Sequence, residues 1–157
     1  MSIQDDSSEL REAATRKSRG SRFAAQVGDF KKKALTNTAK VHRGVSLRLF
    51  KAVILDTPVD TGRLRANWQC SLNVPLATES TSTDPSGSAA INQCAGRIKH
   101  AKPSDAIILT NSLPYVARIE YDGWSHTKAP KGMVRINVIR FKELLGEEVA
   151  LTHTRTS

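Results

Sequence analysis

The chain has 157 residues, of which 39% are hydrophobic and 25% are charged, a composition typical of one globular domain rather than of a disordered chain. Its 24 lysines and arginines outnumber its 15 aspartates and glutamates and give a formal net charge of +9, which admits an acidic partner such as nucleic acid without establishing one. Only 5% of the residues are aromatic, so we expect a small core that association with further copies would help to stabilise.

Targeting and redox features point to the cytoplasm. No apolar run approaches the roughly 18–20 residues that a membrane span needs, and the N-terminus lacks the basic-then-apolar pattern of a signal peptide. Thiols stay reduced in that compartment, so we expect Cys70 and Cys94 to be free thiols. A disulfide between them is the alternative.

Residues 1–22 are polar and charged and show no sustained apolar periodicity. We interpret them as a flexible N-terminal arm, and the alternative is an arm that becomes ordered on a neighbouring subunit. Residues 23–149 are predicted to form a single domain, and residues 150–157 a C-terminal tail.

A long helix is predicted over residues 23–55. Ser21 is a suitable N-cap, and Thr57-Pro58 ends the helix because the residue before a proline resists the helical conformation. Some of its basic residues are candidates for contacts with DNA phosphates, and the alternative is the solvated face of an amphipathic helix. Apolar residues recur at helical spacing: Val27, Phe30, Ala34, Val41, Val45, Leu49 and Val53. The candidate DNA-facing residues are Lys31, Lys32, Lys33 and Arg43.

Residues 56–65 predict a tight corner between this helix and a strand. Asp60 and Thr61 can bond to neighbouring backbone, and Gly62 can adopt a positive φ, so Asp60, Thr61, Gly62 and Arg63 form the candidate structural corner. Apolar and polar residues then alternate over residues 64–72, which predicts a half-buried strand with Cys70 on its apolar side.

The rest of the chain predicts loops and short elements. Residues 75–89 are rich in proline, serine, threonine and glycine and predict a mobile loop. Further elements are expected in chain order: a helix over 89–102, a buried strand over 106–109, one or two helical turns over 114–121 and a C-terminal helix over 130–148 that has Pro130 in its first turn. The predicted fold class is α+β, with the long N-terminal helix packed on a small β-sheet.

Groups that could carry chemistry are scattered along the chain. The four histidines stand singly and the cysteines form no paired motif, so we expect no metal site. There is no Gly-x-Ser-x-Gly sequence and no glycine-rich phosphate loop, so we expect no catalytic residue, no cofactor and no enzyme. A hydrolase using Asp56, Asp60 or His126 is the remaining alternative in this class.

Trp124 stands in a polar, turn-rich segment rather than on a periodic apolar face. It is either a loop tryptophan folded over the core or an anchor in a subunit interface, because aromatic residues often carry such contacts. The candidate subunit-interface residues are Trp68, Trp124, Pro130 and Met133.

Three sequence blocks resemble one family. They are TPVDTGRLRANW at 57–68, LTNSLPYVARIEYDGWS at 109–125 and APKGMV at 129–134. In this order they resemble the tail-completion proteins, also called neck or head–tail joining proteins, of long-tailed bacteriophages. Asp122 is an extra residue relative to the family pattern, and residues 1–22 match no part of it.

The resemblance implies a non-enzymatic structural protein of the virion with an α+β fold. It implies a homo-oligomeric ring at the head–tail joint, expected to be a hexamer, which completes the tail and lines the DNA passage. The implied partners are further copies of the chain, a head connector or head-closure protein, a tail terminator or tail tube protein, and genomic DNA, but no membrane. The implied locations are the virion and, during assembly, the host cytoplasm. A nonspecific nucleic-acid-binding module using the basic helix is the alternative.

Overall fold

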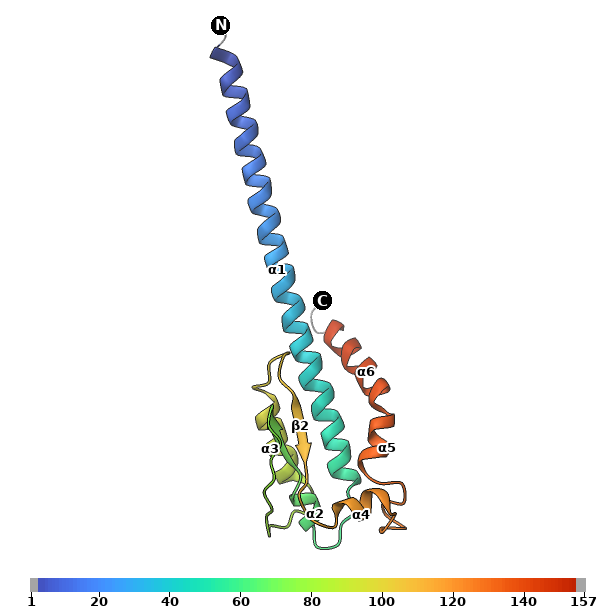
Figure 1. Ribbon diagram of the computed structural model, residues 1–157. Helices are drawn as coiled ribbons and strands as arrows, with labels where there is room; N and C mark the ends of the chain where they lie inside the picture. Colours follow the sequence, from blue (N-terminus) through green and yellow to red (C-terminus); the bar gives the residue numbers. More distant parts are fainter. Residues whose placement is uncertain (1–2, 155–157) are drawn as a thin grey trace. The chain divides into compact units, whose positions relative to one another are not determined.

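The computed structural model describes residues 3–154 and shows a mixed α and β structure (Figure 1). Helix α1 spans Ile3–Asp56, so the helix predicted to begin near residue 23 begins at Ile3, and Ser21 lies inside it rather than capping it. Residues 3–22 contain no proline, and their four arginines, two alanines and two glutamates favour a helix without needing an apolar stripe. The chain divides into two compact units after Asn37, and both strands lie in the second.

Burial along α1 differs between these units. The predicted apolar stripe is buried in the second unit, where Val45, Val53 and Ile54 belong to the buried residues. In the first unit, Val27 and Phe30 are exposed, Phe30 by 75%. Helical periodicity thus predicted the helix correctly, but it could not show which part of the stripe the chain itself covers.

The end of α1 is joined to the following segment through Thr57. The Thr57 hydroxyl donates to the Val53 carbonyl at 2.7 Å and accepts a hydrogen bond from the Trp68 indole N–H at 2.7 Å. Thr57 and Trp68 are both buried. One hydroxyl therefore satisfies a helix-end carbonyl and a buried indole donor, groups that would be costly to leave unpaired.

The strand predicted over residues 64–72 is only partly present. Residues Arg63–Ala66 form a short helix, α2, and strand β1 spans Gln69–Leu72. Leu64, Trp68 and Cys70 are buried as the alternation predicted, but the first two are buried from a helical turn and its exit. The prediction failed there because Gly62 adopts a φ of 87° and directs the chain into a helical turn.

Strand β1 pairs antiparallel with strand β2, Ile107–Thr110, with Cys70 opposite Leu109. Helix α3, Ser88–Ile98, packs on β1, and in Figure 1 the sheet lies between α3 and the second-unit part of α1. The Gln93 side chain accepts from the Cys70 N–H and donates to the Cys70 carbonyl, both at 3.0 Å. A side chain of α3 thus bonds the free edge of β1 as a third strand would.

Three further helices complete the second unit. Helix α4 spans Val116–Tyr121, α5 spans Val134–Ile139 and α6 spans Phe141–Thr154. The predicted C-terminal helix is therefore present but interrupted at Arg140. It begins after Pro130 rather than at it, and it continues through residues that were predicted to be a tail. Polar contacts that join it to α1 include Arg48 to Glu147 at 2.6 Å and the Asn137 amide to the Asp56 carboxylate at 2.8 Å.

We predict that Thr57→Val destabilises the fold by about 1–3 kcal/mol, because the near-isosteric valine leaves the buried Trp68 N–H without an acceptor. Urea unfolding followed by tryptophan fluorescence measures the change. Thr61→Val is the matched control, since Thr61 is exposed, and it should change the unfolding free energy by less than about 0.5 kcal/mol. Equal effects of the two substitutions would contradict the role assigned to Thr57.

Candidate functional site

The corner of residues 60–63 has the positive φ at Gly62 that the sequence predicted, but it leads into helix α2 rather than into a strand. Gly62 has a φ of 87°, and a Cβ atom there would lie 2.6 Å from the Pro85 nitrogen. The Gly62 carbonyl also accepts a hydrogen bond from the Asp84 N–H at 3.2 Å. The Thr61 hydroxyl accepts from the Arg63 N–H at 3.3 Å, whereas Asp60 is exposed. Glycine is thus required both by backbone conformation and by the close approach of another segment.

Arg65 connects three segments at this corner. One of its terminal nitrogens, Nη2, donates to the Leu55 and Thr57 carbonyls at 2.7 Å each, and Nη1 donates to the Pro85 carbonyl at 2.7 Å. Sequence alternation put Arg65 on the polar side of a strand and gave it no role. The sequence did offer one signal for this role. Arg65 follows shortly after Thr57-Pro58, where the helix ends, and the last carbonyl groups of a helix need donors from outside it.

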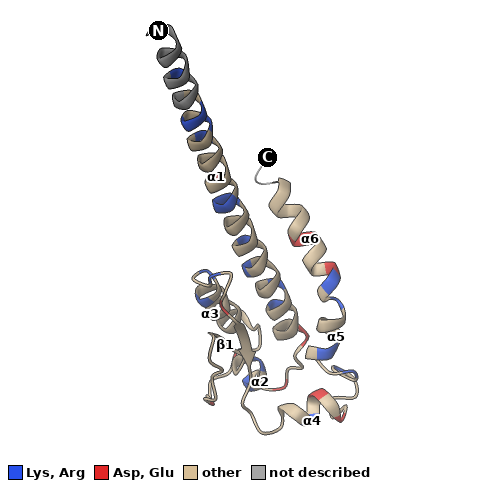
Figure 2. Ribbon diagram, turned by 45° about the horizontal axis from the view of Figure 1, so that its top comes forward, with Lys and Arg blue, Asp and Glu red and all other residues tan. Residues whose placement is uncertain are grey.

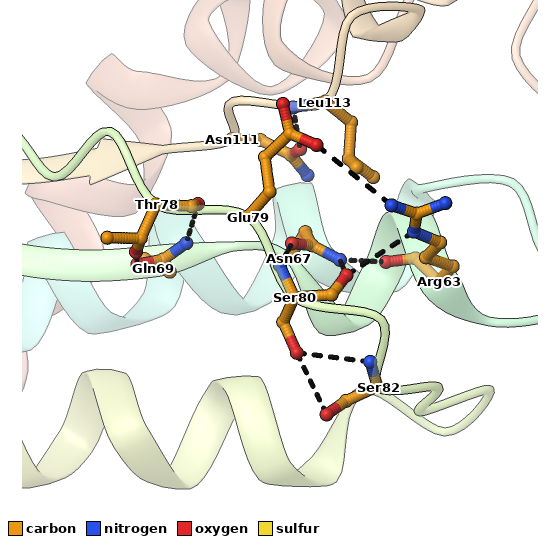
Figure 3. A network of polar contacts seen from close by, with 9 residues as sticks. All are labelled: Arg63, Asn67, Gln69, Thr78, Glu79, Ser80, Ser82, Asn111 and Leu113. Atoms are coloured by element: carbon orange, nitrogen blue, oxygen red, sulfur yellow. Dashed lines mark hydrogen bonds and ion pairs between the residues drawn. The ribbon is translucent and has the colours of Figure 1, made fainter.

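Figure 3 shows the network that holds the segment 75–89 against α2 and β1. The buried Asn67 side chain accepts from the Ser80 N–H at 2.7 Å and donates to the Ser80 carbonyl at 2.9 Å. The Gln69 amide donates to the Thr78 carbonyl at 2.6 Å. The segment is irregular, as predicted, but these bonds tie it to α2 and β1 and argue against the mobility expected of it.

The second sequence block is bonded to the first. The Asn111 side-chain amide donates to the Leu64 carbonyl at 2.9 Å, and the Lys128 ammonium, just beyond the second block, donates to the Val59 carbonyl at 2.7 Å. Segments 57–68 and 109–128 are therefore held together by side chains that bond to backbone carbonyls.

Glu120 connects the second block to the third. Its carboxylate is buried and accepts from the Met133, Val134 and Arg135 N–H groups at 2.7–2.9 Å. These are donors at the start of α5, which has no side-chain cap of its own. Gly132, with a φ of 81°, permits the approach, because a Cβ atom there would lie 2.7 Å from the Glu120 carbonyl oxygen. Sequence reasoning missed Glu120.

The environment of Glu120 favours its ionised form. Burial raises the pKa of the carboxyl group, but the three backbone N–H groups and the Arg135 guanidinium outweigh it and hold the pKa below its ordinary value of 4.5. Because the folded state lowers this pKa, the ionised carboxylate stabilises the fold above pH 4.5. That contribution is lost as the pH falls through the folded-state pKa.

We therefore predict that Glu120→Gln lowers the unfolding free energy at pH 7 by about 1–3 kcal/mol, since an amide replaces a charged acceptor that serves three donors. The difference from the unsubstituted chain should shrink as the pH falls below 4.5. Denaturant unfolding at a series of pH values measures it. Asp122→Asn, at a neighbouring exposed carboxylate, is the control and should show no such convergence. A pH-independent loss would contradict the assigned role of the charge.

The corner and the second block together enclose a groove of about 670 Å³. Leu64 and Ile119 form its buried apolar floor, and Asp60, His126 and Lys128 are exposed residues around it. The remaining lining residues are Pro58, Val59, Thr61, Gly62, Tyr115, Trp124, Ser125 and Thr127.

Trp124 lies at this groove and is 57% exposed, so it is not folded over the core. Its ring meets Tyr115 edge-on, with the ring centroids 6.4 Å apart, and the Arg118 guanidinium lies 5.9 Å from its centroid. These two neighbours hold an aromatic surface in solvent, which suits contact with another molecule.

The other candidate interface residues separate into two groups. Pro130 is exposed, like Trp124. Trp68 and Met133, however, are 5% and 0% exposed and therefore contact no neighbour in this fold. Their apolar character reflects the core of this chain, and the interface interpretation of these two residues is wrong.

The candidate DNA-facing residues also separate. Lys31, Lys32 and Lys33 are exposed and belong to the first unit, whereas Arg43 belongs to the second. Arg43 is half-buried, and its guanidinium donates to the Lys99 and Ala101 carbonyls at 3.3 and 3.4 Å.

Metal-ligating groups do not cluster among the side chains that the structure describes, which are those of Arg11 and residues 15–154. No three side chains of His, Cys, Asp or Glu come together there as a metal site would require. Cys70 and Cys94 are free and fully buried, and their thiols are hydrogen-bonded to each other. That hydrogen bond lowers the pKa of Cys70 and, together with burial, raises the pKa of Cys94. Both thiols are closed off from solvent, whereas a reactive cysteine is at least partly exposed.

Comparison with known proteins gives no match: no family model, no curated protein and no solved structure matches the chain. The resemblance of the three sequence blocks to phage tail-completion proteins therefore stays a prediction. None of the helices within residues 3–154 combines the length and the apolar character that crossing a membrane requires.

Proposed function

We propose that this protein is a structural subunit of a ring at the head–tail joint of a long-tailed phage, where it completes the tail and surrounds the DNA passage. The observation that carries the proposal is that the three sequence blocks of the resemblance form one connected framework. Asn111 joins the second block to the first, and Glu120 joins the second to the third. Residues that are distant in sequence but resemble one family thus meet in space.

The residues of this framework have conformational rather than chemical roles. Gly62 and Gly132 stand where no side chain fits, and Arg65 and Asn67 bond to backbone groups of other segments. A motif made of such residues preserves a shape, which is what a repeating structural subunit requires. This supports a scaffolding role and gives no support to the hydrolase alternative.

Exposed apolar residues supply the surfaces that a ring needs. A closed ring repeats one heterologous contact, in which two different patches of the same chain meet. In our proposal the first patch is the groove beside Trp124. The second is Val138 and Ile139 on α5, the latter 81% exposed, which would enter the groove of the neighbouring copy. Burial of such side chains gives about 1.5–3 kcal/mol each.

We predict that Trp124→Ala and Ile139→Ser each weaken self-association at least tenfold while leaving the monomer folded, because both side chains are already in solvent. Sedimentation velocity over a range of concentrations, with electron microscopy of the assembled species, measures the change. Val74→Ala is the matched control, because Val74 is another exposed apolar residue outside both patches, and it should assemble normally.

Particle assembly tests the function itself. Lysates that lack the protein should accumulate heads and tails that are not joined, and the purified protein should restore joining. Normal joining in its absence would overturn the proposal. A small dimer that stays stable at every accessible concentration would overturn the ring.

A further inference from the structure

The second unit carries a basic cavity that the proposed function has not used. It has a volume of about 410 Å³, and Lys40 and Arg43 of α1 and Lys99, just after α3, line it. Lys40 and Lys99 are exposed. The bonds from Arg43 to the Lys99 and Ala101 carbonyls fasten the turn after α3 to α1. Two elements distant in sequence are thus fixed with their cations around one hollow.

Further cations extend this surface along the same turn. Arg97 and Lys102 are exposed, and Figure 2 shows basic residues at this end of α3 and on α1. We call the set Lys40, Arg43, Arg97, Lys99 and Lys102 the basic patch.

The carboxylates near the patch already have partners. Asp105 accepts from the Lys102 N–H at 2.8 Å and from the Asn73 side chain at 3.2 Å, and these two bonds lower its pKa. Glu148, which lines the cavity, lies 3.7 Å from the Arg48 guanidinium. The five cations therefore exceed the two nearby carboxylates, and the surface has a surplus of positive charge.

The kind of partner follows from what the patch lacks. Protein interfaces have an apolar or aromatic centre, but the apolar residues that line this cavity, such as Leu47 and Ile98, are partly or fully buried. Phosphate binding needs only cations on flexible stems. By contrast, Lys31–Lys33 share their part of α1 with the exposed Phe23, Val27 and Phe30, a combination that suits a protein partner.

We propose that the basic patch binds the phosphate backbone of duplex DNA without sequence preference. The inference rests on the proposed function, in which DNA passes the subunit, and it assigns the DNA contact to the second unit rather than to Lys31–Lys33. The affinity of each copy for DNA is low and falls strongly as the salt concentration rises, because the contacts displace condensed counterions. Weak contacts repeated around a ring would guide DNA without holding it at one position.

Fluorescence anisotropy with a short labelled duplex, measured at a series of salt concentrations, tests the proposal. Lys99→Glu/Lys102→Glu should weaken binding at least tenfold at low salt. It should also reduce the slope of log Kd against log salt by about 2, close to one per phosphate contact. Lys32→Glu/Lys33→Glu is the matched control: it changes the net charge equally and should weaken binding by less than about threefold, through the long-range field alone.

Several results would overturn the inference. The unsubstituted protein could fail to bind DNA at low salt, the control could lose as much affinity as the patch variant, or polyglutamate could displace DNA at equal charge concentration, which would indicate an acidic protein partner. Circular dichroism checks that both variants fold. The assembly experiment separates this inference from the proposed function: a patch variant that binds DNA normally and still joins heads to tails refutes the inference alone.

Discussion

The architecture of the second unit depends on how the C-terminal end of α1 is satisfied. The last carbonyls of any helix lack partners within it, and Pro58 prevents α1 from continuing. The Arg65 guanidinium donates to two carbonyls at this end, and the Thr57 hydroxyl donates to a third. Both groups come from just beyond the helix end, so the same bonds that satisfy α1 also fix the corner. Arg65 then bonds to Pro85, which fixes the entry into α3.

The N-terminal end of α5 follows the same physical rule with opposite polarity. Its first N–H groups are donors without partners, and the buried Glu120 carboxylate accepts three of them. Negative charge at a helix N-terminus is favourable in itself. The start of α5 therefore stabilises the ionised form of Glu120, and the ionised Glu120 in turn stabilises α5. One cation and one anion thus order two helix ends, and the groove beside Trp124 lies among the segments that they position.

Sequence reasoning succeeded where the signal is local. Periodicity predicted α1, α3 and the C-terminal helix, and a short apolar run predicted β2, which is half-buried rather than buried. The residue types around Gly62 predicted a positive φ, which the structure confirms. It failed where a distant partner decides the outcome. Alternation cannot reveal that Leu64 is buried from a helical turn, and nothing near Glu120 in the sequence shows that it accepts hydrogen bonds from Met133 and its neighbours. Burial was misjudged for the same reason: Met133 and Phe30 are both apolar, yet one is in the core and the other in solvent.

The exposed residues extend this reasoning to function. A chain with few aromatic residues would be expected to bury most of them, yet Phe23, Phe30 and Trp124 are all exposed, and such exposure is a feature of surfaces that another molecule covers. The cavity of the basic patch, by contrast, has no exposed apolar side chain among its lining residues. Within the second unit, Trp124 and the basic patch therefore line different cavities. In our proposal a subunit binds its neighbours firmly and DNA only transiently. Separate sites for the two partners would let DNA slide past without disturbing the apolar contact between subunits.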